Sequence, residues 1–234
     1  MPSKLPNVHA GRPRAGRRFE PVRELELSND ALTAARTLPG AHRGVRILLE
    51  TAGPLGVPDV LAVVGPLSVL DERLALDVPP LLNQVDAGVV AAAAASAPRT
   101  LATLARRLGW PEDTLERRLP HLLRSGALLQ TGRDSYVRPE ALRSVGRLYA
   151  IETKVKDWRR ALRQARMYSV WSDSYVIVMP SLGSGSLPGL LAAVAADNGG
   201  LMLDGEWVRR PRLFRRSPAQ RLWGSEHVIA AFDS

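Results

Sequence analysis

The sequence predicts an α/β protein: a mixed β-sheet core flanked by helices, with a smaller α+β module inserted into it. Two short β-branched runs bounded by Gly and Pro, at about 56–65 and 174–180, are typical of buried strands. Between them, helical periodicity extends from about 81 to 125, and the signature of a two-stranded hairpin follows. The chain has 234 residues, enough to bury the core of one or two domains.

Composition shifts along the chain predict four segments. Residues 1–20 are rich in Pro, Gly and Arg and are expected to form a flexible basic arm, which serves either phosphate contacts or solubility. Residues 21–78 form the first part of the core, and Val78-Pro79-Pro80 marks a boundary. Residues 79–140 form the inserted module, and residues 141–234 form the second part of the core.

Charge and composition narrow the class of protein. A formal net charge of +9 and a sequence pI near 10.8 favour a polyanionic partner such as a nucleic acid, although a GC-rich genome also produces arginine-rich proteins. Zero cysteines exclude disulfides, thiolate zinc sites and cysteine nucleophiles. The apolar stretch at 87–95 is too short to span a bilayer, and no apolar segment follows the basic N-terminus as in a secretory signal. We therefore expect a cytoplasmic protein without a membrane partner.

The first part of the core is expected to begin with helix. Residues 29–50 are predicted to be helical, with a break at 38–40 and a second helical stretch through Val45, Ile47, Leu48 and Leu49. The strand at 56–65, which carries Asp59, comes next. A further helix is expected over about 67–77.

Capping and terminating residues mark the ends of the helices in the inserted module. Helices are expected over about 81–96, over 101–108 between Thr100 and Gly109, and over about 111–125, where Gly126 ends the helix. Residues 127–130 and 135–138 then flank a turn at 131–134 and predict a hairpin. Three helices followed by a hairpin is the order of a winged helix-turn-helix. Pro120 conflicts with this prediction, because a proline inside a helix normally kinks it.

The second part of the core alternates again between helix and strand. A short helix is expected at about 140–146, a strand at 148–155, an amphipathic helix at about 158–170 and a buried strand at 174–180. Strands are expected at 190–194 and 201–203, around the turn at 197–200, and a final helix at about 219–232.

Glu152 and Lys154 are the most unusual charges in the second part. Side chains alternate along a strand, so Ile151, Thr153 and Val155 share one face while Glu152 and Lys154 share the other. Two opposite charges on an apolar strand are costly unless they are paired or used. A carboxylate and an ammonium so placed can hold a divalent cation and orient water beside it. The alternative is that both lie on the solvated face of an edge strand.

The order of motifs resembles the PD-(D/E)xK nuclease superfamily, which has the restriction-endonuclease-like fold. The motifs are Glu50, then Pro58-Asp59, then Glu152-x-Lys154, and then a helix carrying Gln164. In that family a glutamate-bearing helix precedes a strand with the aspartate, a neighbouring strand carries E-x-K, and a helix that often presents a glutamine follows. The resemblance covers about residues 40–66 and 147–205, and its motifs are short and degenerate.

The resemblance implies a role for each matching position. Asp59 and Glu152 would bind Mg²⁺ (or Mn²⁺), with help from the backbone carbonyl of Thr153. Lys154 would orient the attacking water and stabilise charge on the scissile phosphate. Glu50 would support the metal or its waters. Gln164 would contact substrate or brace the site.

One departure from the family concerns spacing. The family usually joins its aspartate strand to E-x-K by a short hairpin, whereas about ninety residues separate Asp59 from Glu152 here. That interval matches the inserted module with its linkers, and a surface hairpin tolerates insertions.

The inserted module is expected to bind DNA. The second helix of a helix-turn-helix pair enters the major groove while flanking elements hold phosphates. The residues expected to contact DNA are Arg106, Arg107, Thr114, Arg117, Arg118, His121 and Arg133. A winged helix that binds protein instead is the alternative. Arg159, Arg160, Arg163 and Arg166 line the helix after Lys154, either as a phosphate track or as a solvated face.

Three functions follow from these patterns. The first is a Mg²⁺-dependent DNA endonuclease in defence or repair, in which case a homodimer would serve double-strand cleavage. The second is a non-catalytic DNA-binding transcriptional regulator on a nuclease-like scaffold. The third is a protein-interaction module in a larger assembly. Nucleotide-binding motifs of the G-x-x-x-x-G-K-[ST] and G-x-G-x-x-G types are absent.

Overall fold

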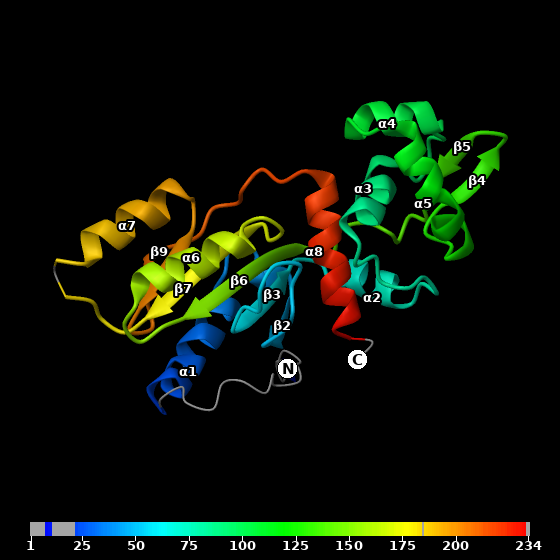
Figure 1. Cartoon of the computed structure of the whole chain (residues 1–234). Helices are drawn as coiled ribbons and strands as arrows, with labels where there is room; N and C mark the ends of the chain where they lie inside the picture. Colours follow the sequence, from blue (N-terminus) through cyan, green and yellow to red (C-terminus); the bar gives the residue numbers. More distant parts are fainter. Residues whose placement is uncertain (1–7, 11–21, 184, 233–234) are drawn as a thin grey trace. The chain divides into compact units, whose positions relative to one another are not determined.

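The computed structural model describes residues 8–10, 22–183 and 185–232, and it divides the chain into two compact units. Unit 1 comprises residues 1–67 and 146–215; unit 2 comprises residues 68–145 and 216–234. The elements of both units are labelled in Figure 1. Helices and a mixed sheet together confirm the predicted α/β class.

Unit 1 is built on one mixed sheet in the order β1-β2-β3-β6-β7-β8-β9. The strands are β1 Val8–Ala10, β2 Val45–Leu49, β3 Val60–Val64, β6 Arg147–Thr153, β7 Ser174–Met179, β8 Gly200–Leu203 and β9 Glu206–Arg209. β3 runs antiparallel to both of its neighbours, whereas β6, β7 and β8 are parallel. β2, β6, β7 and β8 therefore all end at the same edge of the sheet.

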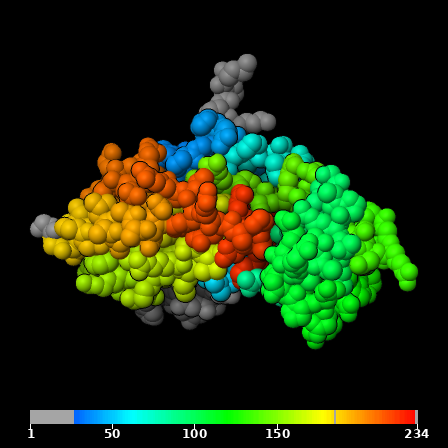
Figure 2. Space-filling view, turned by 90° about the horizontal axis from the view of Figure 1, so that it is seen from above, coloured from blue at the N-terminus to red at the C-terminus, as the bar shows by residue number. Residues whose placement is uncertain are grey.

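Helices cover both faces of this sheet. α1 (Val22–Arg36) packs its alanines on the face that carries Ile47, Val60 and Ile151. α6 (Trp158–Tyr168) and α7 (Leu187–Ala196) pack on the face that carries Tyr175 and Ile177. Figure 2 shows these two helices side by side on one face of unit 1, α6 in yellow-green and α7 in yellow to orange. Alternation along β6 places Glu152 on the α6 side.

Unit 2 contains five helices and a hairpin in the residues that the structure describes. They are α2 Ser68–Leu74, α3 Gln84–Ala92, α4 Leu101–Leu108, α5 Glu112–Arg124, β4 Leu129–Gly132, β5 Ser135–Val137 and α8 Pro218–Ala230. Thr100 caps α4 through Thr103 N–H, and Gly109 ends it in the left-handed conformation, as predicted. α5 continues through Pro120, whose ring is exposed. Arg99 also pairs with Tyr136 of β5, which adds a third, single-bridge strand to the hairpin.

The C-terminal helix α8 belongs to unit 2, which corrects the predicted boundary that gave residues 141–234 to the core. Its buried Glu226 accepts two hydrogen bonds from Arg73 of α2 and one from Leu81 N–H. Trp223 Nε1 donates to Leu82 O. A buried ion pair between residues 153 positions apart leaves no local pattern in the sequence, so neither α2 nor α8 could be assigned to unit 2 from spacing alone.

Three other expectations are wrong, and one strand was not predicted. Residues 45–49 form strand β2 rather than helix, and residues 187–196 form α7 rather than a strand at 190–194. Both are short apolar runs, in which periodicity alone does not separate helix from strand. No helix forms over 140–146, and strand β9 escaped prediction because its residues alternate only weakly in polarity.

Residues 8–10 of the segment predicted as a flexible arm form β1 at the sheet edge, and the remainder of that arm lies outside the described residues. Among the helices described, none is long and apolar enough to cross a membrane.

Candidate active site at one edge of the sheet

Three carboxylates follow one another across the edge where β2 and β6 end. The β2–β3 register pairs Leu49 with Val60, and the next pair along is Glu50 with Asp59, joined by a hydrogen bond from Glu50 N–H to Asp59 O at 3.1 Å. The β3–β6 register pairs Val60 with Ile151, so Asp59 is next opposite Glu152. The structure therefore brings Glu50, Asp59 and Glu152 to one sheet edge despite their separation in sequence.

Asp59 is held in place by Thr153. The backbone N–H and the hydroxyl of Thr153 both donate to Asp59 Oδ2, each at 2.7 Å. These two bonds fix the carboxylate, which is partly exposed at the start of β3. Thr153 thus orients Asp59 through its N–H and its side chain, a contribution that the motif alone did not predict.

Glu152 and Lys154 form a buried ion pair. Their side chains are 0% and 7% exposed, and Lys154 Nζ lies 3.3 Å from Glu152 Oε1. Burial of the carboxyl group, reinforced by the negative charge of Asp59, raises the pKa of Glu152 from its ordinary 4.5 to about 7, and Lys154 opposes this rise. Neither side chain lies on a solvated face, so the edge-strand alternative for this pair is wrong.

Tyr168, near the end of the predicted amphipathic helix, also belongs to the site, although no sequence motif indicates it. Its hydroxyl lies 2.8 Å from Glu152 Oε2 and 3.0 Å from the carbonyl oxygen of Val57. A phenol within one helical turn of Gln164 was the available signal, because residues at i and i+4 share a helix face. Tyr168 therefore connects α6 to Glu152 and to the segment between β2 and β3.

That segment, residues 50–59, packs closely on the end of α6. Trp171 Nε1 donates to Leu55 O at 3.2 Å. A Cβ at Gly53 would lie 2.3 Å from the Trp171 ring, and one at Gly56 would lie 2.8 Å from the Tyr168 ring. Gly56 also has φ +83°, a backbone conformation that favours glycine. The close approach of ring and backbone holds Asp59 against the end of β6.

Two buried oxygens at this site accept no hydrogen bond from the residues that the structure describes. They are Glu152 Oε1, whose only contact is the ion pair with Lys154, and Gln164 Oε1. Buried oxygens normally accept hydrogen bonds, so two exceptions need an explanation. Carboxylate and amide oxygens are ligands that hard divalent cations prefer, and the donor set therefore fits Mg²⁺. Within the described ranges, no cluster of three or more His, Cys, Asp or Glu side chains has a metal-binding arrangement.

The residues expected to contact DNA are distributed over unit 2. Arg106 and Arg107 are exposed at the end of α4, and Arg133 is exposed in the β4–β5 turn. Arg117 is 72% exposed, and its Nε donates to Asp113 O at 3.1 Å. Its Nη2 lies 3.5 Å from Thr114 Oγ1. These side chains are accessible on α4, α5 and the hairpin.

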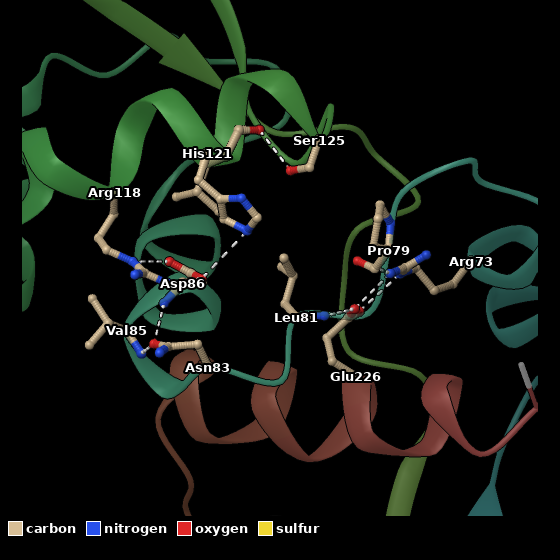
Figure 3. Close-up of polar contacts among 11 residues, drawn as sticks. Arg73, Pro79, Leu81, Asn83, Val85, Asp86, Arg118, His121, Ser125 and Glu226 are labelled. Carbon is tan, nitrogen blue, oxygen red and sulfur yellow. Dashed lines mark hydrogen bonds and ion pairs between the residues drawn. The ribbon is translucent and has the colours of Figure 1, made fainter. Parts of the chain in front are cut away.

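Arg118 and His121 have a different environment from the other five. Arg118 donates to both carboxylate oxygens of Asp86 in α3, with Nε to Oδ1 at 2.7 Å, and His121 Nε2 lies 4.0 Å from Oδ2. Figure 3 shows both α5 side chains directed at Asp86. They line an open pocket of about 280 Å³ with Pro79, Pro80, Leu81, Leu82, Asn83 and Ser125. The guanidinium of Arg118 thus joins α5 to α3.

Comparison with protein-family models, with curated proteins and with solved structures found no match.

Proposed function

We propose that the protein is a Mg²⁺-dependent DNA endonuclease. The observation that carries this proposal is the arrangement of Asp59, Glu152 and Lys154 at one sheet edge, with Glu152 Oε1 buried and accepting no hydrogen bond. The motif order that resembles the PD-(D/E)xK superfamily agrees with it, and so does a mixed sheet with helices on both faces. Residues 68–145 of unit 2 lie between β3 and β6 in the sequence, which accounts for the long spacing between Asp59 and Glu152.

The residues that would hold the cation are Asp59 and Glu152, with water completing its coordination. Mg²⁺ retains several waters and needs few protein carboxylates, so two carboxylates are sufficient to hold it. When bound, the cation supplies Lewis-acid activation of water and of the phosphate. Mn²⁺ would fit the same oxygen set.

The chain's own residues supply the remaining functions. Lys154 places a positive charge 3.3 Å from Glu152, where it can orient water and stabilise negative charge on the phosphate. Thr153 fixes the orientation of Asp59. Tyr168 donates toward Glu152 Oε2, so a bound cation would share Oε1 with Lys154, whose Nζ lies 3.3 Å from it. Glu50 follows β2 opposite Asp59, and Gln164 lies one helical turn before Tyr168 on α6. Both would support bound water or substrate.

Unit 2 is proposed as a winged helix that docks on DNA. In support, three helices (α3, α4 and α5) precede the hairpin. Arg99, which lies between α3 and α4 in the sequence, pairs with β5, as the first strand of a winged helix does. Arg106, Arg107 and Arg133 are exposed and suited to phosphate contacts. Thr114 and Arg117 are the accessible candidates on α5 for base contacts.

The test is cleavage of supercoiled plasmid by the purified chain with Mg²⁺, with Mn²⁺ and with EDTA. We expect nicked or linear product with either metal and none with EDTA. Lys154→Ala and Asp59→Asn should each abolish product, while Arg43→Gln, an exposed substitution at the opposite sheet edge, should cut like the wild type. Cleavage in EDTA, or undiminished cleavage by Lys154→Ala, contradicts the proposal.

The second candidate is a DNA-binding regulator without catalytic activity. The observation that favours it is the closed ion pair between Glu152 and Lys154, which already satisfies both charges. This candidate predicts plasmid binding in gel-shift assays without product under Mg²⁺ or Mn²⁺. It also predicts that Lys154→Ala leaves binding unchanged.

A further inference from the structure

In the described part of unit 1, positive charge is concentrated in two short segments. Residues 154–166 carry six Lys and Arg against one Asp, and residues 209–215 carry four Arg and no acidic residue. The rest of the described part of unit 1 carries five Arg against ten Asp and Glu. A polyanion that approaches unit 1 is therefore attracted to these segments and repelled by most of the remaining surface.

Four of the six cations of the first segment lie on α6, and Lys156, just before the helix, is also exposed. Arg159, Arg160 and Arg163 are exposed, and among the described residues none of them pairs with a carboxylate. Arg159 lies 4.6 Å above the Trp158 ring, which restricts its guanidinium. Asp157 caps the helix by accepting from the backbone N–H of Arg160. Arg166 differs from these three because Asp197 binds it at 2.6 Å.

The face of α6 that carries these arginines begins a short connection away from Lys154. α6 starts at Trp158, four residues after Lys154, so chain length limits their separation to roughly 14 Å. Arg159 and Arg163 are one turn apart, a rise of about 6 Å along the helix. Tyr168, on the same helix, reaches Glu152. A phosphate backbone running along this face would therefore lead to Lys154.

The second basic segment and α5 are weaker candidates than α6 for holding DNA phosphates. Arg212 N–H donates to Asn198 O, in the turn before β8, which lies at the edge of the sheet opposite Glu152. α5 carries three acidic residues against three Arg, so its charge is balanced, and Arg118 is bound to Asp86. The second segment therefore lies at the wrong edge of the sheet, and the cations of α5 are balanced by acidic residues.

We propose that Arg159, Arg160 and Arg163 of α6, together with Lys156, form the surface that holds the phosphates of the DNA strand beside the cleavage site. This inference rests on the proposed function, because it assigns the substrate track of the same site. It adds a phosphate contact in unit 1 to those proposed for unit 2. The attraction is electrostatic and independent of base sequence.

The experiment measures binding of a short fluorescein-labelled duplex by anisotropy over a series of salt concentrations, with Ca²⁺ in place of Mg²⁺. The triple variant Arg159→Gln/Arg160→Gln/Arg163→Gln should bind the duplex at least about tenfold more weakly than the wild type. The slope of the logarithm of the binding constant against the logarithm of the salt concentration should decrease in magnitude by roughly 2 to 3. The matched control, Arg36→Gln/Arg43→Gln/Arg212→Gln, removes the same charge from other exposed positions of unit 1 and should retain most of the slope. The triple change to Lys should restore binding, because phosphate contacts need charge.

The outcomes separate this inference from the proposed function. Equal loss of slope in the α6 triple and in its control, or no rescue by Lys, overturns the α6 surface even where the wild type cuts plasmid. Loss of slope confined to the α6 triple, rescued by Lys, supports the surface even where no cleavage is seen with Mg²⁺. Circular dichroism of each variant establishes that the fold is intact.

Discussion

At the scale of single residues, the site is a group of buried charges that restrain one another. The carboxylate of Glu152 is fully buried between Tyr168 and Lys154, and Thr153 holds Asp59 next to it. Alternation along a strand was enough to predict that Glu152 and Lys154 share a face. The role of Tyr168 was not predictable, because the angle at which a helix crosses a sheet decides which strand residue its phenol reaches.

Glu152 should make stability depend on pH. Its pKa in the folded protein, about 7, lies above its ordinary 4.5, so the folded state binds this proton more tightly than the unfolded state does. The contribution of Glu152 to the free energy of unfolding should therefore be greatest below about pH 4.5 and fall by roughly 3 kcal/mol as pH rises through 7, at about 1.4 kcal/mol per pKa unit. Urea unfolding at about pH 5 and about pH 8 measures this difference.

The Glu152→Gln variant is the control for that pH dependence. An amide does not titrate, so the variant should lose less stability than the wild type between the two pH values. Identical pH dependence in both proteins would show that other groups govern it.

Tyr168→Phe should weaken the site without disturbing its packing. The ring contacts with Trp171 and Gly56 remain, while the hydroxyl next to Glu152 and Val57 is lost. We expect a loss of about 1 to 2 kcal/mol in the free energy of unfolding and slower plasmid cleavage at saturating DNA.

Tyr149→Phe is the matched comparison for Tyr168→Phe. Tyr149 is equally buried, but its ring packs on the α1 face of the sheet and its hydroxyl makes no hydrogen bond to the site. Its removal should leave stability and cleavage nearly unchanged. Equal effects of the two substitutions would remove the special role of Tyr168.

At the scale of elements, caps and long periodic patterns predicted structure better than short apolar runs did. α4, α5, α6, α8, the hairpin and β7 lie close to their predicted bounds, because capping residues, glycines and alternation mark them locally. β2 and α7 were predicted in the wrong conformation. Each is a run of small or aliphatic residues whose conformation depends on its neighbours: β2 pairs with β3, and α7 packs on the sheet.

The segment between β2 and β3 should be intolerant of added volume. In Gly56→Ala, the new methyl group would meet the Tyr168 ring at 2.8 Å while the backbone stays at φ +83°. We expect a loss of roughly 2 to 4 kcal/mol in the free energy of unfolding, measured with urea, from strain and overpacking together.

Gly109→Ala separates these two causes. Gly109 also has a positive φ, +68°, but nothing lies within 4 Å of the added Cβ. Only the backbone strain, about 1 kcal/mol, should appear there. A loss at Gly56 no larger than that at Gly109 would mean that the segment moves aside without cost.

At the scale of the whole molecule, the chain forms unit 1, enters unit 2, returns to unit 1, and ends in unit 2. The sequence predicted the insertion, because the helical module separates Asp59 from Glu152. It did not predict the return of α8 to unit 2, since that depends on the pairing of Glu226 with Arg73 rather than on any feature near residue 216.

Glu226→Ala should destabilise unit 2 strongly. The substitution leaves the guanidinium of Arg73, which is 1% exposed, without its carboxylate, and breaking a buried pair in this way costs about 3–5 kcal/mol. Arg143→Ala is the comparison, because its pairs with Glu72 and Glu140 are partly exposed and should contribute about 1 kcal/mol or less. Calorimetry should resolve this difference, and similar melting curves for the two variants would contradict it.

The antiparallel pairing of β3 with β6 also has a consequence for how the protein folds. These strands meet only after about eighty intervening residues are brought round, and closing so long a loop costs roughly 2.5 kcal/mol more entropy than closing a short hairpin. Gly65 and Gly146 lie side by side where that excursion begins and ends. An insert that folds early would hold its own ends together and shorten the effective loop. The proposed DNA-docking unit would then also act as an internal folding aid, bringing together the two strands that carry Asp59 and Glu152.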